Sequence, residues 1–187
     1  HKGGGVGQTP DYWNNNYQDD IYFRNGEPEE SKGYCTDVFF DEAISFINKN
    51  KENPFLCFLS LNAPHSPFNV PKEYYELYEN ESDLLESQKR FYGMITNIDD
   101  NFGRLHQHVE SLGILHNTII IFTTDNGTSN GYKYSKKHKK WLGFNAGMRG
   151  TKTSEYDGGH RVPFIIKWKK GGLYGGHNYS GLSAHVD

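Results

Sequence analysis

The sequence has few cysteines, no apolar run of membrane-spanning length and no strong excess of either charge. Only two cysteines occur in 187 residues, Cys35 and Cys57, and no Cys-x-x-Cys motif is present. Their number and spacing exclude a disulfide framework and a cysteine-based zinc site. A net charge of −3 with interspersed signs argues against bulk electrostatic binding to nucleic acid or to an anionic membrane.

Apolar periodicity predicts the order helix, strand, long helix, strand in the middle of the chain. A first helix is predicted over residues 37–48 and an apolar strand over residues 54–61. Apolar residues at alternating steps of four and three then predict a helix over about residues 82–112, and the next strand covers residues 118–124. A strand, helix, strand order is typical of a right-handed crossover, so we expect the two strands to lie parallel in one sheet.

The part of the chain after Gly127 is rich in glycine, serine, asparagine, lysine and tyrosine up to Gly150, which predicts a long surface loop. A last strand is predicted over residues 162–168. The loop contains a basic run made of Lys133, Lys136, Lys137, His138, Lys139 and Lys140. This run is either a solvated loop face or a means of attracting an anionic substrate.

Chemically informative residues follow the strand predicted at residues 118–124. The strand ends in Asp125, Asn126 and Gly127. This order places carboxylate and carboxamide oxygens at the carboxyl end of the strand, where the active sites of open α/β sheets lie. Lys152 follows on a glycine-rich loop and would supply fixed positive charge. Taken alone, Asp-Asn-Gly is also typical of an Asx-turn, and an isolated lysine is often only an exposed side chain.

Five segments together resemble the sulfatases, the sulfuric-ester hydrolases of the alkaline-phosphatase-like superfamily. A strand-end Asp-Asn-Gly at residues 125–127 is followed by Gly-Thr-Lys at 150–152 and by Tyr-Asp-Gly-Gly-His-Arg-Val-Pro at 156–163. Upstream, residues 61–68 resemble the family's Ala-Pro-His-x-Pro segment, and residues 3–13 resemble its glycine-rich lead-in. The resemblance therefore extends from one end of the sequence to the other.

The resemblance implies a fold, a reaction and a set of site residues. The fold would be a three-layer α/β sandwich with a mostly parallel sheet, of which residues 1–187 form a single, incomplete domain. The reaction would be hydrolysis of sulfate esters by a formylglycine nucleophile with a divalent metal, calcium by preference. Asp125 and Asn126 would be metal ligands, and Lys152 and His65 would be catalytic residues that contact the sulfate ester. From its position alone, a loop histidine such as His65 could instead be merely solvated.

The family's nucleophile is missing from these residues. Formylglycine is made from the first residue of Cys/Ser-x-Pro-x-Arg, and neither Cys35 nor Cys57 has the proline and arginine at the required offsets. Asp19 and Asp20 are not preceded by the apolar strand that the family's Asp-Asp pair closes, so we interpret them as loop residues. We therefore expect this segment alone to be inactive.

Two alternatives to a sulfatase parent stay open at the level of sequence. The parent could be a phosphodiesterase or phosphonate hydrolase of the same superfamily, which would differ in its nucleophile. The chain could also be a non-catalytic truncated piece with a structural or binding role. For a sulfatase, the resemblance implies a sulfate-ester small molecule or sulfated glycan as substrate, neither nucleic acid nor membrane as partner, and a secreted, periplasmic or lysosomal location. Arg161 is expected to brace its turn through carboxylates rather than to contact substrate.

Overall fold

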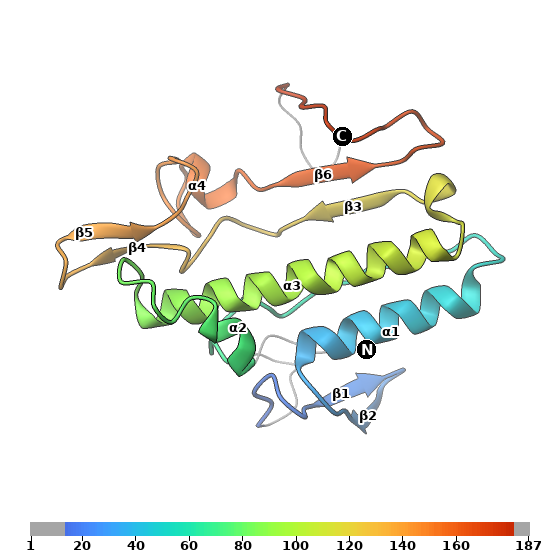
Figure 1. Cartoon of the computed structure of the whole chain (residues 1–187), viewed down its shortest axis with the longest axis horizontal. Helices are drawn as coiled ribbons and strands as arrows, with labels where there is room; N and C mark the ends of the chain where they lie inside the picture. Colours follow the sequence, from blue (N-terminus) through green and yellow to red (C-terminus); the bar gives the residue numbers. More distant parts are fainter. Residues whose placement is uncertain (1–13, 182–187) are drawn as a thin grey trace.

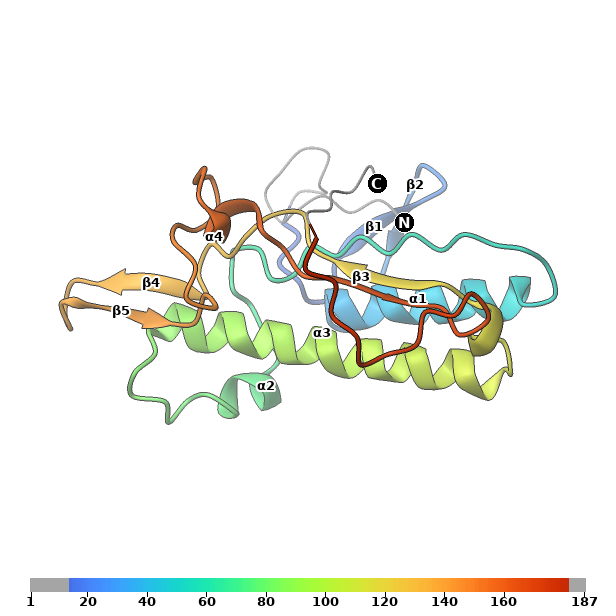
Figure 2. The same ribbon diagram turned by 90° about the horizontal axis from the view of Figure 1, so that it is seen from above.

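Two long helices form the scaffold of the chain, which is described for residues 14–181 by a computed structural model. In chain order the elements are β1 (Ile21–Arg24), β2 (Glu27–Glu30), α1 (Cys35–Asn50), α2 (Lys72–Glu76), α3 (Glu86–Ser111), the 3-10 helix η1 (Leu115–Asn117), β3 (Ile120–Thr123), β4 (Tyr132–Ser135), β5 (Lys140–Gly143), α4 (Asp157–His160) and β6 (Phe164–Lys167). Helices α1 and α3 pack together on one side of an extended layer that contains β3 and β6 (Figures 1 and 2).

Both long helices were predicted, and both are confirmed within a few residues of their expected ends. Helix α1 buries Phe39, Ala43 and Ile47, whose four-residue spacing places them on one face. Helix α3 starts later than predicted because the Gln88 side chain accepts a hydrogen bond from the backbone N–H of Leu85 (2.9 Å) and so closes the first turn. Gly113 follows α3 with a φ of 72°, the left-handed conformation that commonly ends a helix.

The predicted parallel sheet is not present among residues 14–181. Strand β3 pairs with β6, and this ladder is antiparallel, with Ile121 opposite Ile166. Residues 54–61 run in the same direction as β3 (Figures 1 and 2), as expected for two segments joined by a crossover. No ladder joins them, however, and no backbone–backbone hydrogen bond within the described residues involves 54–61. The strand predicted there is therefore an extended segment without a lateral partner.

The extended layer packs on the helices with one face and exposes the other, although the packed face is not covered at β6, where Ile165, the register partner of Phe122, is 60% exposed. Phe55, Leu59 and Ile120 pack toward α1 and α3 in the two apolar clusters of the chain. The alternating positions point the other way, since Leu56 and Phe58 are 86% and 87% exposed. We call the exposed side the bare face and define it by Leu56, Phe58, Ile119, Ile121, Phe164 and Ile166. Side chains on opposite faces of an extended chain alternate in this way.

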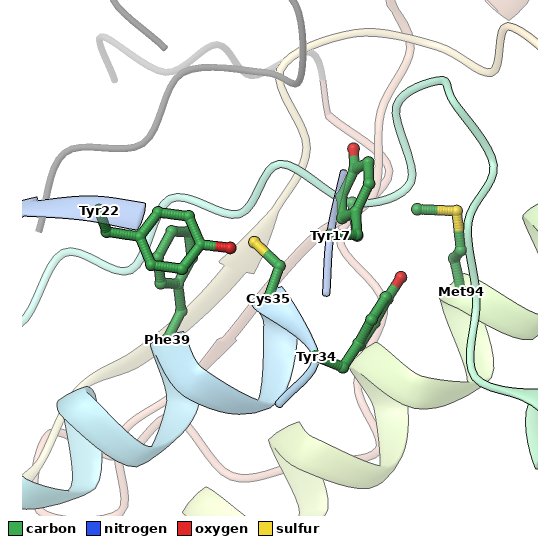
Figure 3. Close-up of a cluster of buried hydrophobic side chains, with 7 residues drawn as sticks. Tyr17, Tyr22, Tyr34, Cys35, Phe39 and Met94 are labelled. Atoms are coloured by element: carbon green, nitrogen blue, oxygen red, sulfur yellow. The ribbon is translucent and has the colours of Figure 1, made fainter. Parts of the chain in front are cut away.

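A cluster of buried aromatic and sulfur-containing side chains supports the loop at residues 62–70 (Figure 3). It consists of Tyr17, Tyr22, Tyr34, Cys35, Phe39, Ala63 and Met94. The rings of Tyr17 and Tyr34 stack with their centroids 6.0 Å apart, and their hydroxyls donate to the carbonyls of His65 (2.9 Å) and Asn69 (3.0 Å). Burial raises the pKa of Tyr34, so its hydroxyl remains protonated as a donor.

The prediction of a long surface loop after Gly127 is wrong in part, because this segment contains the antiparallel hairpin β4–β5. Asp19 and Asp20 lie in a loop, as predicted, and Asp20 accepts hydrogen bonds from the backbone of Asn16 (2.7 Å) and Tyr17 (2.9 Å). The glycine-rich segment at residues 3–13 lies outside the described residues. No helix within 14–181 has the length and apolar character to span a membrane.

Candidate active site

Backbone hydrogen bonds join the three loops that carry the site motifs. The N–H of Gly127 donates to the carbonyl of Gly159 (2.9 Å), and the N–H of Lys152 donates to the carbonyl of Thr128 (2.9 Å). A third bond runs from the N–H of Gly158 to the carbonyl of Arg149 (2.8 Å). These bonds connect the segment after β3, the segment before α4 and α4 itself into one unit. The unit can be found around α4 in Figure 1.

The glycines of this unit are required by close backbone approach. A Cβ atom on Gly127 would lie 1.9 Å from the carbonyl oxygen of Gly158. A Cβ atom on Gly158 would in turn lie 2.1 Å from the carbonyl oxygen of Gly150. Real Cβ atoms do not approach backbone oxygens so closely, so only glycine allows the loops to stack in this way. The Asp-Asn-Gly, Gly-Thr-Lys and Asp-Gly-Gly motifs therefore fit one another physically.

Asp125 and Asn126 lie where β3 ends, as predicted. The Asp125 side chain is exposed, whereas the Oδ1 atom of Asn126 is buried and has no hydrogen-bond partner within residues 14–181. A buried acceptor without a partner is costly, and a hard cation is a partner that a carboxamide oxygen can take. The Oδ1 atom of Asn126 is therefore one oxygen donor that a divalent cation could use. No group of three or more His, Cys, Asp or Glu side chains within the described residues could hold a metal ion.

Lys152 lies in a tight turn beside the strand end. The turn is closed by a hydrogen bond from the N–H of Ser154 to the carbonyl of Thr151 (3.0 Å), and Thr153 adopts a positive φ of 75°. The Lys152 side chain is exposed, while its backbone is fixed to Thr128. The ammonium group therefore extends from a rigid base and is available to an anion.

His65 lies on a different loop, which the buried tyrosine cluster fixes from below. Its side chain is half-buried, and its Nδ1 donates to the carbonyl of Ser66 (2.8 Å). Because a carbonyl only accepts, Nδ1 is the protonated donor in this contact. Within the described residues no hydrogen bond or ion pair joins His65 to Asp125, Asn126 or Lys152, so the structure does not bring these residues into direct contact.

Arg161 braces its own turn, as expected from the sequence. Its guanidinium lies 3.6 Å from the Asp157 carboxylate, and both side chains are exposed.

Sequence reasoning missed two other features of the site. Thr128 links the Lys152 loop to the following hairpin, and nothing in the sequence marks it. The hairpin β4–β5 itself has a signal, because Tyr132, Tyr134 and Trp141 fall on one face when the two strands are paired.

Comparisons with known proteins give a class of fold first. A crystal structure of Ps i-CgsB in complex with k-i-k-neocarrahexaose superimposes with a TM-score of 0.64 at 31% sequence identity, over 78% of this chain and 30% of that one. The solved structures that resemble this chain include sulfatases of the alkaline-phosphatase-like fold. The arrangement of helices and extended segments therefore corresponds to part of an alkaline-phosphatase-like hydrolase domain.

Sequence comparison then identifies the family. The family model for sulfatases matches residues 2–187, so the chain belongs to the sulfatase family. It is 31% identical over 175 residues to the uncharacterized sulfatase YdeN of Escherichia coli strain K12, which covers 91% of this chain and 29% of that protein. It is 31% identical over 135 residues to the N-acetylgalactosamine-6-O-sulfatase of Bacteroides thetaiotaomicron, over 71% of this chain and 25% of that protein. The chain thus spans less than a third of these two relatives.

Proposed function

We propose that this chain supplies one part of the active site of a sulfatase that hydrolyses sulfate esters with a formylglycine nucleophile. The observation that carries the proposal is the buried, unpartnered Oδ1 of Asn126 at the strand end, beside the rigid Lys152 turn. The buried carboxamide oxygen of Asn126 is complementary to a cation, and the exposed ammonium of Lys152, whose backbone is bonded to Thr128, is complementary to an anion. A sulfate ester bound to a metal ion presents both a cation, the metal, and an anion, the sulfate group.

Asp125 and Asn126 would hold the metal, which we propose to be calcium because all donors offered here are oxygens and one is neutral. When bound, the metal would neutralise charge on the sulfate group. The chain's own residues would do the rest: Lys152 would bind a sulfate oxygen through its ammonium. His65 would donate a proton to the departing alcohol oxygen.

The remaining ligands and the nucleophile would come from the part of a sulfatase catalytic domain that residues 1–187 do not span. Two features support this. The bare face exposes six large apolar side chains, more than isolated surface residues require. Residues 54–61 also form no backbone–backbone hydrogen bond within the part of the chain that the structure describes, and an extended segment in this state is a template for another strand. We therefore propose that strands and helices of that missing part pair with 54–61 and cover the bare face.

The substrate class we propose is a sulfated glycan. Among the relatives, one is named an N-acetylgalactosamine-6-O-sulfatase, and the Ps i-CgsB structure contains k-i-k-neocarrahexaose. We propose that residues 1–187 alone are inactive, because the nucleophile is not among them.

The test compares the native product that contains these residues with the 187-residue chain alone. Peptide mapping by mass spectrometry would look for formylglycine in a Cys/Ser-x-Pro-x-Arg peptide, and both samples would be assayed with an aryl sulfate and a bis-aryl phosphate. We expect formylglycine and sulfate release in the native product only. Turnover by the 187-residue chain, or phosphodiester hydrolysis without formylglycine, would overturn the proposal.

Variants of the native product assign the roles. Lys152→Ala and His65→Ala should each lower kcat by about 100-fold, which is the usual contribution of one charge-stabilising or proton-donating group. Lys49→Ala, an exposed lysine at the end of α1, is the matched control and should leave kcat unchanged. Equal effects of Lys152→Ala and Lys49→Ala would remove Lys152 from the site.

A further inference from the structure

One face of the hairpin β4–β5 carries a platform of aromatic rings. Tyr132 and Trp141 stack with centroids 4.9 Å apart and planes 16° from parallel, and Tyr134 contacts Trp141 edge-on at 5.8 Å. The opposite face packs on α3, where Leu142 is buried and its carbonyl accepts a hydrogen bond from Gln88 (2.8 Å). Trp141 and Tyr134 are 52% and 47% exposed, so the platform faces away from the body of the chain.

The hairpin also carries positive charge, of which only the Lys140 ammonium has a carboxylate partner among the described residues. Lys140 pairs with Asp83 (3.0 Å), which lowers the pKa of that carboxyl through a hydrogen bond. Three exposed lysines, Lys136, Lys137 and Lys139, lie in the turn between the strands and form no ion pair within the described residues. Lys133 is also exposed and unpaired there, but it is the register partner of Leu142 and so lies on the face opposite the aromatic rings. An uncompensated cluster of this kind attracts polyanions.

The hairpin is fixed directly to the candidate active site. The Thr128 hydroxyl accepts a hydrogen bond from the N–H of Gly131 at the base of β4 (2.8 Å), and the Thr128 carbonyl accepts one from Lys152 (2.9 Å). Tyr92 on α3 closes the base of the hairpin, because its hydroxyl donates to the Gly131 carbonyl and accepts from the N–H of Phe144 (3.0 Å). Figures 1 and 2 both show the hairpin extending from the site beside α4.

We propose that the hairpin β4–β5 is a binding surface for a sulfated polysaccharide, on which the aromatic platform stacks against sugar rings and the lysines pair with sulfate groups. The proposal rests on the proposed function, and it extends that function from the cleaved ester to neighbouring sugar units. Sugar rings present flat C–H faces that pack on aromatic side chains, and sulfate groups accept charge-assisted hydrogen bonds from lysine. Single-stranded nucleic acid could also stack here, but the position beside a sulfate-ester site favours a glycan.

The experiment measures Kd by titration calorimetry on the 187-residue chain, so it requires no turnover. The probes are a sulfated galactan octasaccharide, its desulfated counterpart and a single-stranded oligonucleotide of equal charge. The variants are Lys136→Gln/Lys137→Gln/Lys139→Gln and Trp141→Ala. Their matched controls are Lys51→Gln/Lys169→Gln/Lys170→Gln, which removes equal exposed charge elsewhere, and Tyr174→Ala, an exposed aromatic outside the hairpin. Circular dichroism confirms that each variant is folded.

We expect the hairpin triple variant to bind the sulfated octasaccharide about tenfold more weakly, since three of its cationic partners are removed. Trp141→Ala should weaken binding about fivefold through loss of stacking area, and both controls should bind like wild type. Equal weakening by the two triple variants, unchanged binding by both hairpin variants, or tighter binding of the oligonucleotide would each overturn the proposal. If formylglycine is absent from the native product but the hairpin variants still lose binding, the proposed function fails and this surface stands.

Discussion

One face of residues 55–61 packs on the helices, whereas the other is exposed. Phe55, Cys57, Leu59 and Leu61 face the helices, and Phe55 meets Phe46 of α1 with ring centroids 6.0 Å apart. Of the three residues between them, Leu56 and Phe58 are also apolar, yet they are 86% and 87% exposed, and the third is Ser60. Apolarity on both faces is typical of a strand buried between two layers. Only one of those layers lies among residues 14–181.

The largest expected effect comes from making the same substitution on the two sides. Phe39→Ala in the covered cluster should lower the free energy of unfolding by about 3–5 kcal/mol, as deletions of buried phenylalanine do. Phe58→Ala on the bare face should change it by less than about 0.5 kcal/mol. Urea unfolding of the 187-residue chain measures both, and Phe39→Leu serves as a milder variant if Phe39→Ala does not fold. Equal losses at both positions would show that the bare face is already packed.

A smaller loss is expected at the stacked loops of the site. Gly127→Ala should cost about 2 kcal/mol or more, because its Cβ would overlap the Gly158 carbonyl and force the loops apart. Gly103→Ala is the control, since Gly103 lies in α3 with no atom near the added Cβ; it should stabilise the chain by about 1 kcal/mol. A neutral Gly127→Ala, measured by the same unfolding titration, would contradict the close approach of these loops.

Removing one hydroxyl from the covered cluster tests how it supports the His65 loop. Tyr17→Phe deletes the donor to the carbonyls of His65 and Asn62 and should cost about 1 kcal/mol, the usual net value of such a bond. Hydrogen exchange should also become faster in residues 62–70. Tyr179→Phe, at an exposed tyrosine, is the control. Unchanged hydrogen exchange in residues 62–70 of Tyr17→Phe would show that the cluster does not stabilise this loop.

The smallest effect compares thiol reactivity across one extended segment. Burial raises the pKa of Cys57, so its thiol should react with iodoacetamide at pH 8 at least about tenfold more slowly than a cysteine introduced as Leu56→Cys. The raised pKa favours the protonated folded form, and its contribution to stability is therefore complete below the unfolded thiol pKa and lost as the pH rises through the folded one. Peptide mapping gives the rates, and equal rates would contradict the two-faced segment.

The sequence contains enough to predict the parts of the fold that are stabilised locally or by nearby packing. Helices α1 and α3 follow from apolar spacing, and β3 and β6 from their β-branched residues. The strand at 54–61 and its parallel pairing were not found, because a strand needs hydrogen-bonding partners that these residues do not have among 14–181. The hairpin β4–β5 was missed because lysine and glycine obscure the alternation of Tyr132, Tyr134 and Trp141.

The candidate site shows the same division. Asp125, Asn126 and Lys152 lie on loops that were predicted to be near one another, and backbone bonds do join those loops. These bonds form only because Gly127 and Gly158 have no Cβ atom and allow the backbones to approach closely. A sequence motif shows that glycine is present but not which backbone it approaches. The structure fixes the His65 loop through Tyr17 and Tyr34, and the role of His65 in the site stays a prediction.

The central claim is that the bare face is an interface with the rest of a sulfatase catalytic domain. Hydroxyl-radical footprinting with mass spectrometry tests it directly, by comparing oxidation of Leu56 and Phe58 in the native product with oxidation in the 187-residue chain. We predict strong protection of both residues in the native product, together with sulfate-ester hydrolysis. Equal oxidation in the two samples, with hydrolysis present in the native product, would contradict the account.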